Sequence, residues 1–346
     1  MFKSLFLVFF YLSCILCTAQ TGFSWQATVF TGKNITHASE RIVKEDMHYG
    51  ICVDFNKKTN GTKYWQYAHG FPQMGLQLTL RTLGNNEVYG NAVSIVPYLE
   101  FNVWRTRSGE LQIKHGSGLA YVSKIFDKDN NPSAIILSSH INATTMVDLG
   151  YRFFLTENWD FKMGMVLHHI SNGGFKLPNL GFNTGSVYAG CSYYAKGKKL
   201  SQIDRLPFRD FKRMLLRVGF ALGFNNYVKG KSVDLNPEIS TAMFYQHNTR
   251  FRTGLGIALN KPRHFAIQPS LYLEEEVQFA QIVTRYAFGA YLANKRNVGE
   301  DLYSKIGIAW FPQTKTYIPD RFYIGANLKA HKYVAAHVEL TAGYAF

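Results

Sequence analysis

The sequence predicts an all-β protein, a transmembrane antiparallel β-barrel of roughly 12 to 16 strands in the outer membrane of a Gram-negative bacterium. Three observations lead to this prediction. The chain opens with an export signal, its body consists of segments of about ten residues that alternate between apolar and polar positions, and it ends on an aromatic residue.

The export signal comprises residues 1–19. Lys3 precedes an apolar run from Leu5 to Leu16, and small residues at Thr18 and Ala19 precede Gln20, the expected first residue of the exported chain. The apolar run is shorter than the roughly 20 residues that a membrane-spanning helix needs. We therefore expect residues 20–346 to form the barrel and to contain no membrane-spanning helix.

The alternation is regular enough to assign a face to each residue. Within 213–225, apolar residues occupy every second position from Met214 to Phe224, while Arg213, Arg217 and Gly219 occupy the other face. Segments 95–104 and 321–329 follow the same rule. Since successive side chains of a strand point to opposite faces, we expect one face toward lipid and one toward a polar lumen. A soluble β-sandwich would also alternate, but its outward faces would be polar.

The last segment, 333–346, ends on the aromatic Phe346. A terminal aromatic residue at this spacing resembles the signal that the outer-membrane barrel assembly machinery reads, so this machinery is an expected partner.

The chain divides into two halves. Eight candidate strands lie between Phe23 and Tyr194, and about as many lie between Arg213 and Phe346. Residues 20–195 form the first half, 196–212 a basic loop, and 213–346 additional strands. Because closure removes sheet edges, we expect a single barrel. The alternative is an eight-stranded barrel with accessory β-structure.

The chain is basic, with 38 Lys and Arg against 23 Asp and Glu. Cleavage after residue 19 removes Lys3 and leaves a net charge of +14. In an exported protein this excess favours anionic lipid headgroups and lipopolysaccharide phosphates over nucleic acid. We expect no cofactor and no metal. His331, His337 and Glu339 share a face, but their spacing spreads them too far for one ion, and the phases of Cys52 and Cys191 predict two free thiols.

Polar residues interrupt one lipid face. Met165 and Leu167 face outward, and the same phase carries His169 and Ser171 outward as well. Asn183 extrapolates to the outward face of the next segment. Polar side chains on a lipid face cost free energy, so this cluster is a candidate site unless it only marks the end of a strand. A histidine can activate a serine hydroxyl, and a third group can orient the histidine.

The segment His169-Ile170-Ser171-Asn172-Gly173-Gly174, followed by 178–183 (PNLGFN), resembles the lipid A 3-O-deacylase (PagL) family of outer-membrane barrels. Weaker resemblance extends from Gly116 to Tyr194, and the second half is not covered. The resemblance implies hydrolysis of the ester of a 3-hydroxyacyl chain on lipid A. It assigns His169 as general base, Ser171 as nucleophile, Asn179 and the Gly174 N–H as oxyanion donors, and Asn172 as a substrate contact.

Asn183 departs from the family pattern, which has Glu at this position. An amide can orient the imidazole but cannot stabilise its charge, which affects the rate more than the reaction type. The alternatives are a non-enzymatic barrel, either a pore or a scaffold, and an esterase for ordinary phospholipids. Lumen cations expected at Arg217, Arg285, Lys305, Arg321 and Lys329 suit any closed barrel.

Overall fold

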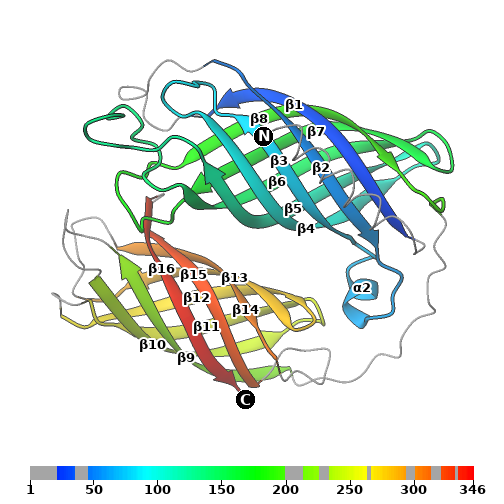
Figure 1. Cartoon of the computed structure of the whole chain (residues 1–346). Helices are drawn as coiled ribbons and strands as arrows, with labels where there is room; N and C mark the ends of the chain where they lie inside the picture. The colour runs from blue at the N-terminus through cyan, green and yellow to red at the C-terminus, as the bar shows by residue number, and fades with distance from the viewer. Residues whose placement is uncertain are drawn as a thin grey trace. The chain divides into compact units, whose positions relative to one another are not determined.

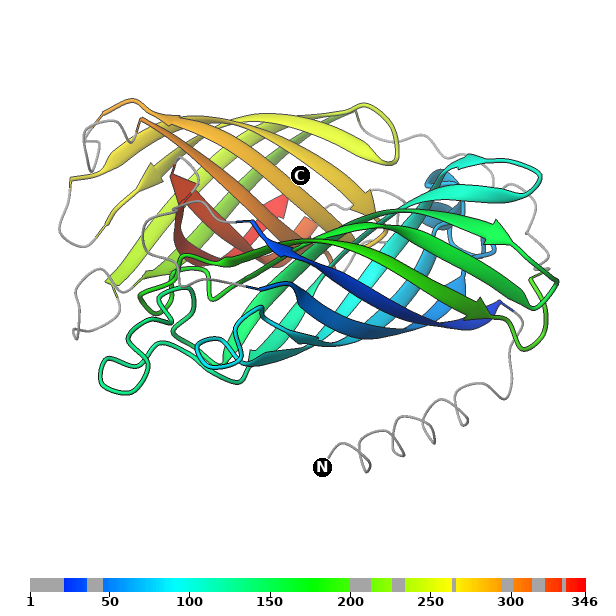
Figure 2. The ribbon, with the colours of Figure 1, turned by 90° about the horizontal axis from the view of Figure 1, so that it is seen from above.

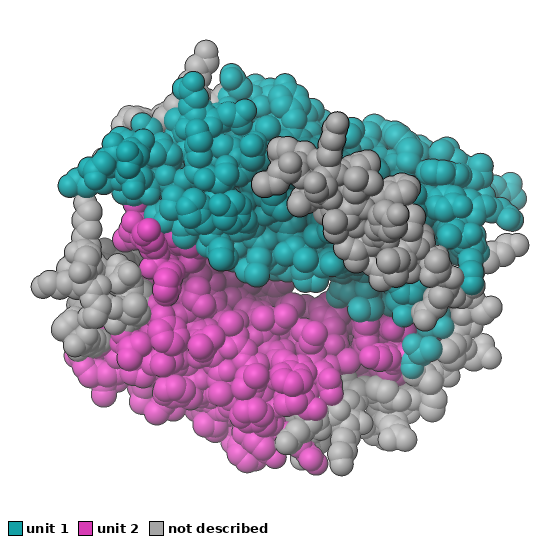
Figure 3. Space-filling model, viewed as in Figure 1, with its two compact units in different colours: residues 1–62, 70–171, 180–204 teal, residues 63–69, 172–179, 205–346 magenta. Residues whose placement is uncertain are grey.

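The computed structural model of the protein describes residues 22–35, 46–198, 213–225, 234–262, 266–293, 301–312, 321–331 and 334–346. The chain forms two compact units, which Figure 3 distinguishes by colour. One comprises residues 1–62, 70–171 and 180–204, and the other comprises 63–69, 172–179 and 205–346. The expected export signal lies outside the described residues, as does most of the basic loop 196–212.

The first eight strands form a closed antiparallel barrel in which each strand pairs with its neighbour in the chain and β1 pairs with β8. Figure 2 shows this seam, with blue β1 beside green β8. The strands are β1 (Phe23–Asn34), β2 (His48–Lys58), β3 (Gln73–Thr82), β4 (Asn91–Arg105), β5 (Gly109–Val122), β6 (Ile141–Phe154), β7 (Trp159–Ser171) and β8 (Phe182–Tyr193). A short helix, α2 (Tyr64–Ala68), lies between β2 and β3 in the chain.

The last eight strands form a second closed antiparallel barrel, in which β16 returns to pair with β9 (Figure 1). They are β9 (Met214–Asn225), β10 (Asp234–Gln246), β11 (Phe251–Asn260), β12 (Gln268–Phe279), β13 (Ile282–Tyr291), β14 (Leu302–Trp310), β15 (Arg321–His331) and β16 (Val334–Ala345). Strands of 9 to 15 residues are long enough to cross a bilayer when tilted, which takes about 9 to 11 residues.

The predicted all-β antiparallel barrel class is confirmed, but the expected single barrel of 12 to 16 strands is wrong. The sixteen strands close as two barrels of eight, and the second half is a complete barrel rather than accessory structure. β8 pairs back to β1 instead of onward to β9, and β16 pairs back to β9. The physical reason is that two small rings remove the sheet edges as completely as one large ring does.

The alternation of faces is as predicted. Apolar side chains such as Ile51, Met165 and Leu167 in the first barrel and Leu255 in the second are exposed on the outside. Polar residues between them are buried in the lumens. This distribution is that of a barrel whose exterior contacts lipid. Among the described residues, no helix is long and apolar enough to cross a bilayer.

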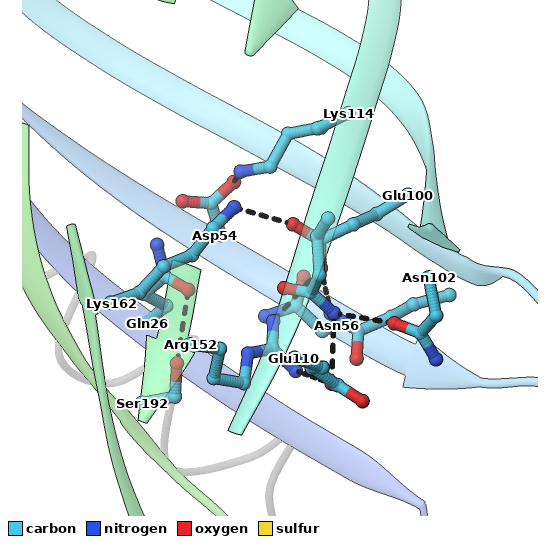
Figure 4. Close-up of polar contacts among 12 residues, drawn as sticks. Gln26, Asp54, Asn56, Glu100, Asn102, Glu110, Lys114, Arg152, Lys162 and Ser192 are labelled. Carbon is cyan, nitrogen blue, oxygen red and sulfur yellow. Dashed lines mark hydrogen bonds and ion pairs between the residues drawn. The ribbon is translucent and has the colours of Figure 1, made fainter. Parts of the chain in front are cut away.

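Ion pairs fill the lumen of the first barrel (Figure 4). Glu100 lies 2.8 Å from Arg152 and 2.6 Å from Lys162, and Asp54 lies 2.9 Å from Lys114. All five side chains are buried. Charges inside a barrel are stable only when they are paired and hydrogen-bonded, so the five strands that carry them are connected across the lumen.

The second lumen is filled in the same way. Arg217 and Arg285 each lie 2.7 Å from Glu274, and Lys305 lies 2.6 Å from Glu238. Lys329 is also buried and lies 3.3 Å from Glu238. The predicted lumen positions of Arg217, Arg285, Lys305 and Lys329 are therefore confirmed. Arg321 shares the phase of the buried Tyr323, but it is the first residue of β15 and its side chain is exposed, so it is not buried in the lumen as the others are.

The two cysteines point to different faces, as predicted from their phases. Cys52 is buried in the first lumen and Cys191 is exposed on the outside of β8. Both are free thiols.

Candidate active site

The candidate site lies where β7 ends and β8 begins. His169 on β7 is directly opposite Asn183 on β8, and the pairing of the two strands runs without a shift from Trp159 to Ile170. A bulge in β7 would have turned His169 into the lumen, but the register contains none. His169 therefore keeps the outward phase of Met165 and Leu167, while its neighbour His168 is buried on the lumen side.

His169 and Asn183 are hydrogen-bonded, with 2.6 Å between His169 Nδ1 and Asn183 Oδ1. The Asn183 oxygen can only accept, so Nδ1 carries the hydrogen and donates it. The neutral imidazole then has its lone pair on Nε2. This tautomer is the one that a general base acting through Nε2 requires.

Ser171 is the last residue of β7, two positions after His169 and on the same face. It pairs with Ala143 of β6 just as His169 pairs with Thr145. The Cα atoms of residues two apart on a strand are separated by about 7 Å, so their side chains can approach each other. Ser171 is 6% exposed, which shields its hydroxyl from bulk water.

Gly181 packs against the edge of the His169 ring. Its φ of +76° lies in the left-handed region, and a Cβ placed on it would come within 2.8 Å of His169 Cε1. Glycine is therefore required at this position both by the backbone and by the ring. The Gly181 N–H donates to the Ile136 carbonyl at 3.2 Å, which holds the backbone in place.

The loop between the two strands contains the predicted oxyanion donors. The Asn172 N–H donates to Asn179 Oδ1 at 3.3 Å, and the Gly174 N–H donates to Asn172 Oδ1 at 3.0 Å. Gly173 and Gly174 both have positive φ, which makes this tight turn possible. The Gly174 N–H is thus engaged by Asn172, and it can serve an oxyanion only by exchanging that bond.

Two polar residues near the site were not predicted from the sequence. Thr145 of β6 lies opposite His169, and Ser117 of β5 lies opposite Thr145. Both point outward, because they share the phase of Val147 and Leu119. The alternation reveals their outward phase, but their alignment with His169 depends on the register between strands.

The other candidate ligand positions are not brought together. His331 Nε2 lies 3.1 Å from the Tyr291 hydroxyl, whereas His337 lies 3.3 Å from Glu339. Within the described ranges, no group of three His, Cys, Asp or Glu side chains is arranged to hold a metal ion.

Comparison with known proteins gives one family match. Residues 49–192, from β2 to β8, match the family model of lipid A 3-O-deacylase (PagL). No curated protein matches the chain.

Solved structures resemble the chain at low identity. Neisserial surface protein A is 15% identical with a TM-score of 0.36, covering 50% of this chain and 97% of its own. The outer-membrane enzyme PagL is 16% identical with a TM-score of 0.31, covering 48% and 97%. A BenF-like porin from Pseudomonas fluorescens is 10% identical with a TM-score of 0.22, covering 94% and 97%.

The family match spans seven of the eight strands of the first barrel and includes His169, Ser171 and Asn183, whereas the second barrel lies outside it. The first barrel, over residues 49–192, is thus similar to the lipid A 3-O-deacylase (PagL) family, which confirms the resemblance predicted from the motif.

Proposed function

We propose that the protein is an outer-membrane lipid A deacylase, which hydrolyses an ester-linked 3-hydroxyacyl chain with Ser171, His169 and Asn183. The observation that carries the proposal is the 2.6 Å hydrogen bond from His169 to Asn183, in a segment that matches the lipid A 3-O-deacylase family. The hydrogen bond selects the imidazole tautomer with a free Nε2, which is the form that can take a proton from a serine.

In the proposed reaction, Ser171 Oγ attacks the ester carbonyl carbon and its proton passes to His169 Nε2. Asn179 and the Gly174 N–H stabilise the oxyanion, and Asn172 contacts the substrate. The sugar oxygen leaves with the proton from His169, and the acyl chain remains on Ser171. A water molecule then attacks the acyl carbon and gives a proton to His169. His169 passes this proton to Ser171 Oγ as the bond to the acyl group breaks, which releases the hydroxy acid.

The position of the site suits a lipid substrate. His169 and Ser171 share the outward phase of β7, so they lie on the wall of the barrel that contacts lipid and not in the lumen. At the opposite end of the same barrel, two of the three hairpin connections, residues 106–108 and 155–158, are short turns, and the third, 59–72, contains α2. Trp25, Trp159 and Tyr193 pack together at this end. Short turns and aromatic belts are typical of the periplasmic end of bacterial barrels, which supports a site on the outer-leaflet side.

The alternative of a pore is disfavoured by both lumens. Glu100, Arg152 and Lys162 form a buried network in one, and Arg217, Glu274 and Arg285 form another in the second. An ion would have to break these pairs to pass. The second barrel therefore fits a scaffold better than a channel.

The test uses the full-length protein, reconstituted in vesicles that contain lipopolysaccharide, with lipid A read by mass spectrometry. The variants are Ser171→Ala and His169→Ala. Ser304→Ala is a matched control, because Ser304 is an exposed serine on a strand of the second barrel. We expect the wild-type protein and the control to remove one hydroxyacyl chain, and the two site variants to leave lipid A intact.

The possible outcomes distinguish a lipid A deacylase from its alternatives. Intact lipid A with the wild-type protein would overturn the deacylase, and release of fatty acid from phospholipids alone would identify an ordinary esterase. Full activity of Ser171→Ala would exclude this serine as the nucleophile. A fluorophosphonate probe that labels the wild-type protein but not Ser171→Ala would independently support serine dependence.

A further inference from the structure

A row of polar side chains crosses the outside of the first barrel at the level of the candidate site. Asn183, His169, Thr145 and Ser117 lie on four consecutive strands, each directly opposite the next. Adjacent strands are about 4.8 Å apart, so Ser117 lies about 10 Å from His169 across the sheet. The row is thus much wider than a Ser, His and Asn triad needs.

Ser117 and Thr145 are hydrogen-bonded to each other, with 2.9 Å between their hydroxyl oxygens. The Thr145 hydroxyl also donates to the Gly116 carbonyl at 3.1 Å. A hydroxyl has only one hydrogen, so Thr145 has none left for Ser117, and Ser117 donates to Thr145. The Ser117 oxygen accepts nothing from Thr145, so the pair offers an acceptor at Ser117 Oγ on the outward face of β5.

The end of a strand does not account for this pair. On β5, Leu119 and Tyr121 lie between Ser117 and the nearer strand end, and on β6, Ile141 and Ala143 lie beyond Thr145. Leu119, Ile141 and Val147 are all strongly exposed on the same face. Besides the row itself, the polar residue next to the pair on this face is His115, two positions before Ser117, and its Nδ1 lies 3.0 Å from the Met146 carbonyl. The two hydroxyls are therefore set beside apolar side chains on the outer wall, where uncompensated polar groups cost free energy.

We propose that Ser117 and Thr145 bind a hydrogen-bond donor of the substrate, a hydroxyl or an amide N–H, about 10 Å from the ester that is cleaved. This inference rests on the proposed deacylase function and adds a substrate-positioning contact to it. A glycolipid whose acyl linkages carry amide N–H or hydroxyl groups supplies such a donor. A diacyl phosphatidylcholine or a simple ester, which has no such donor, gains nothing from the pair. The flanking Leu119 and Val147 contact the hydrocarbon chains.

The test compares two substrates on the same full-length variants. Lipid A carries the donors, and 4-nitrophenyl octanoate does not. The double variant Ser117→Ala, Thr145→Val removes both hydroxyls, and Thr145→Ser restores the hydroxyl at position 145. Thr241→Val makes the same exchange at an outward threonine of β10 in the second barrel.

We expect the double variant to raise the KM for lipid A about tenfold, the effect of one lost hydrogen bond, with kcat and the hydrolysis of the nitrophenyl ester unchanged. Thr145→Ser and Thr241→Val should behave as wild type. Equal losses on both substrates, or no loss on either, would overturn the inference while leaving the deacylase intact. A wild-type protein inactive toward lipid A overturns the proposed function and this inference together.

Discussion

His169 and Asn183 face each other across the β7–β8 ladder, and their side chains meet at 2.6 Å on the outside of the barrel. A carboxylate in place of the amide would stabilise the imidazolium that forms when serine is deprotonated. The neutral amide can only orient the ring. Asn183 can therefore orient the His169 ring, but it cannot stabilise a positive charge on it.

Substitutions of Asn183 distinguish the orientation of the imidazole from the stabilisation of its charge. Asn183→Asp keeps the shape and adds the charge, so we expect kcat on lipid A to rise. Asn183→Ala removes the orienting acceptor and should lower kcat by about 10- to 100-fold, since hydrogen bonds to a charged group contribute about 1.5–3 kcal/mol. Initial rates of lipid A deacylation measure both. Unchanged kcat in Asn183→Ala would contradict an orienting role.

Gly181 should control the position of the imidazole. Gly181→Ala places a Cβ against His169 Cε1 and is expected to reduce kcat at least tenfold in folded protein. Gly70→Ala is the control, because Gly70 also has positive φ but has open space around its Cβ position. Both variants bear the backbone penalty of about 1 kcal/mol. Equal activity of the two would show that the ring tolerates the methyl group.

The lumen ion pairs should dominate the stability of the first barrel. Glu100→Gln leaves Arg152 and Lys162 without their shared carboxylate, and breaking a buried pair costs about 3–5 kcal/mol. The midpoint of urea unfolding, followed by tryptophan fluorescence, should fall. Four of the five tryptophans lie before residue 200, so the signal reports mainly on the first half. Glu157→Gln, on an exposed turn, should leave the midpoint in place.

The two thiols should differ in reactivity. In a chain that begins at Gln20, Cys52 and Cys191 are the only cysteines. A maleimide should label Cys191 in detergent-solubilised folded protein, because it is exposed, and label Cys52 only after unfolding. Mass spectrometry of the labelled protein counts the adducts, and Cys191→Ser should abolish labelling of the folded state. Two adducts on the folded wild-type protein would contradict the lumen position of Cys52.

The sequence was sufficient to predict the faces of the strands, and the candidate site was proposed from those faces together with the motif. The period of two is a local property, and it places His169, Ser171 and Arg217 without any knowledge of their neighbours. Barrel closure is not local. The alternation of Arg213 to Asn225 is the same in a ring of eight or of sixteen strands, so the pairing of β8 with β1 could not be read from it.

The register between neighbouring strands is the second property that the apolar–polar alternation does not predict. Ser117 and Thr145 can be assigned to the outer face from their own segments. Their alignment with His169 follows only from how β5, β6 and β7 are offset along one another. A site that extends across several strands is therefore harder to predict than one confined to a strand and the loop that follows it.

The two closing strand pairs, β1 with β8 and β9 with β16, affect how the sequence can evolve. Each ring completes its hydrogen bonds with strands from its own half, so an insertion, a loss or a replacement of the whole second ring leaves every ladder of the first in place. The number of strands can then change in steps of eight. Selection on the face that carries His169 and selection on the second ring can proceed independently.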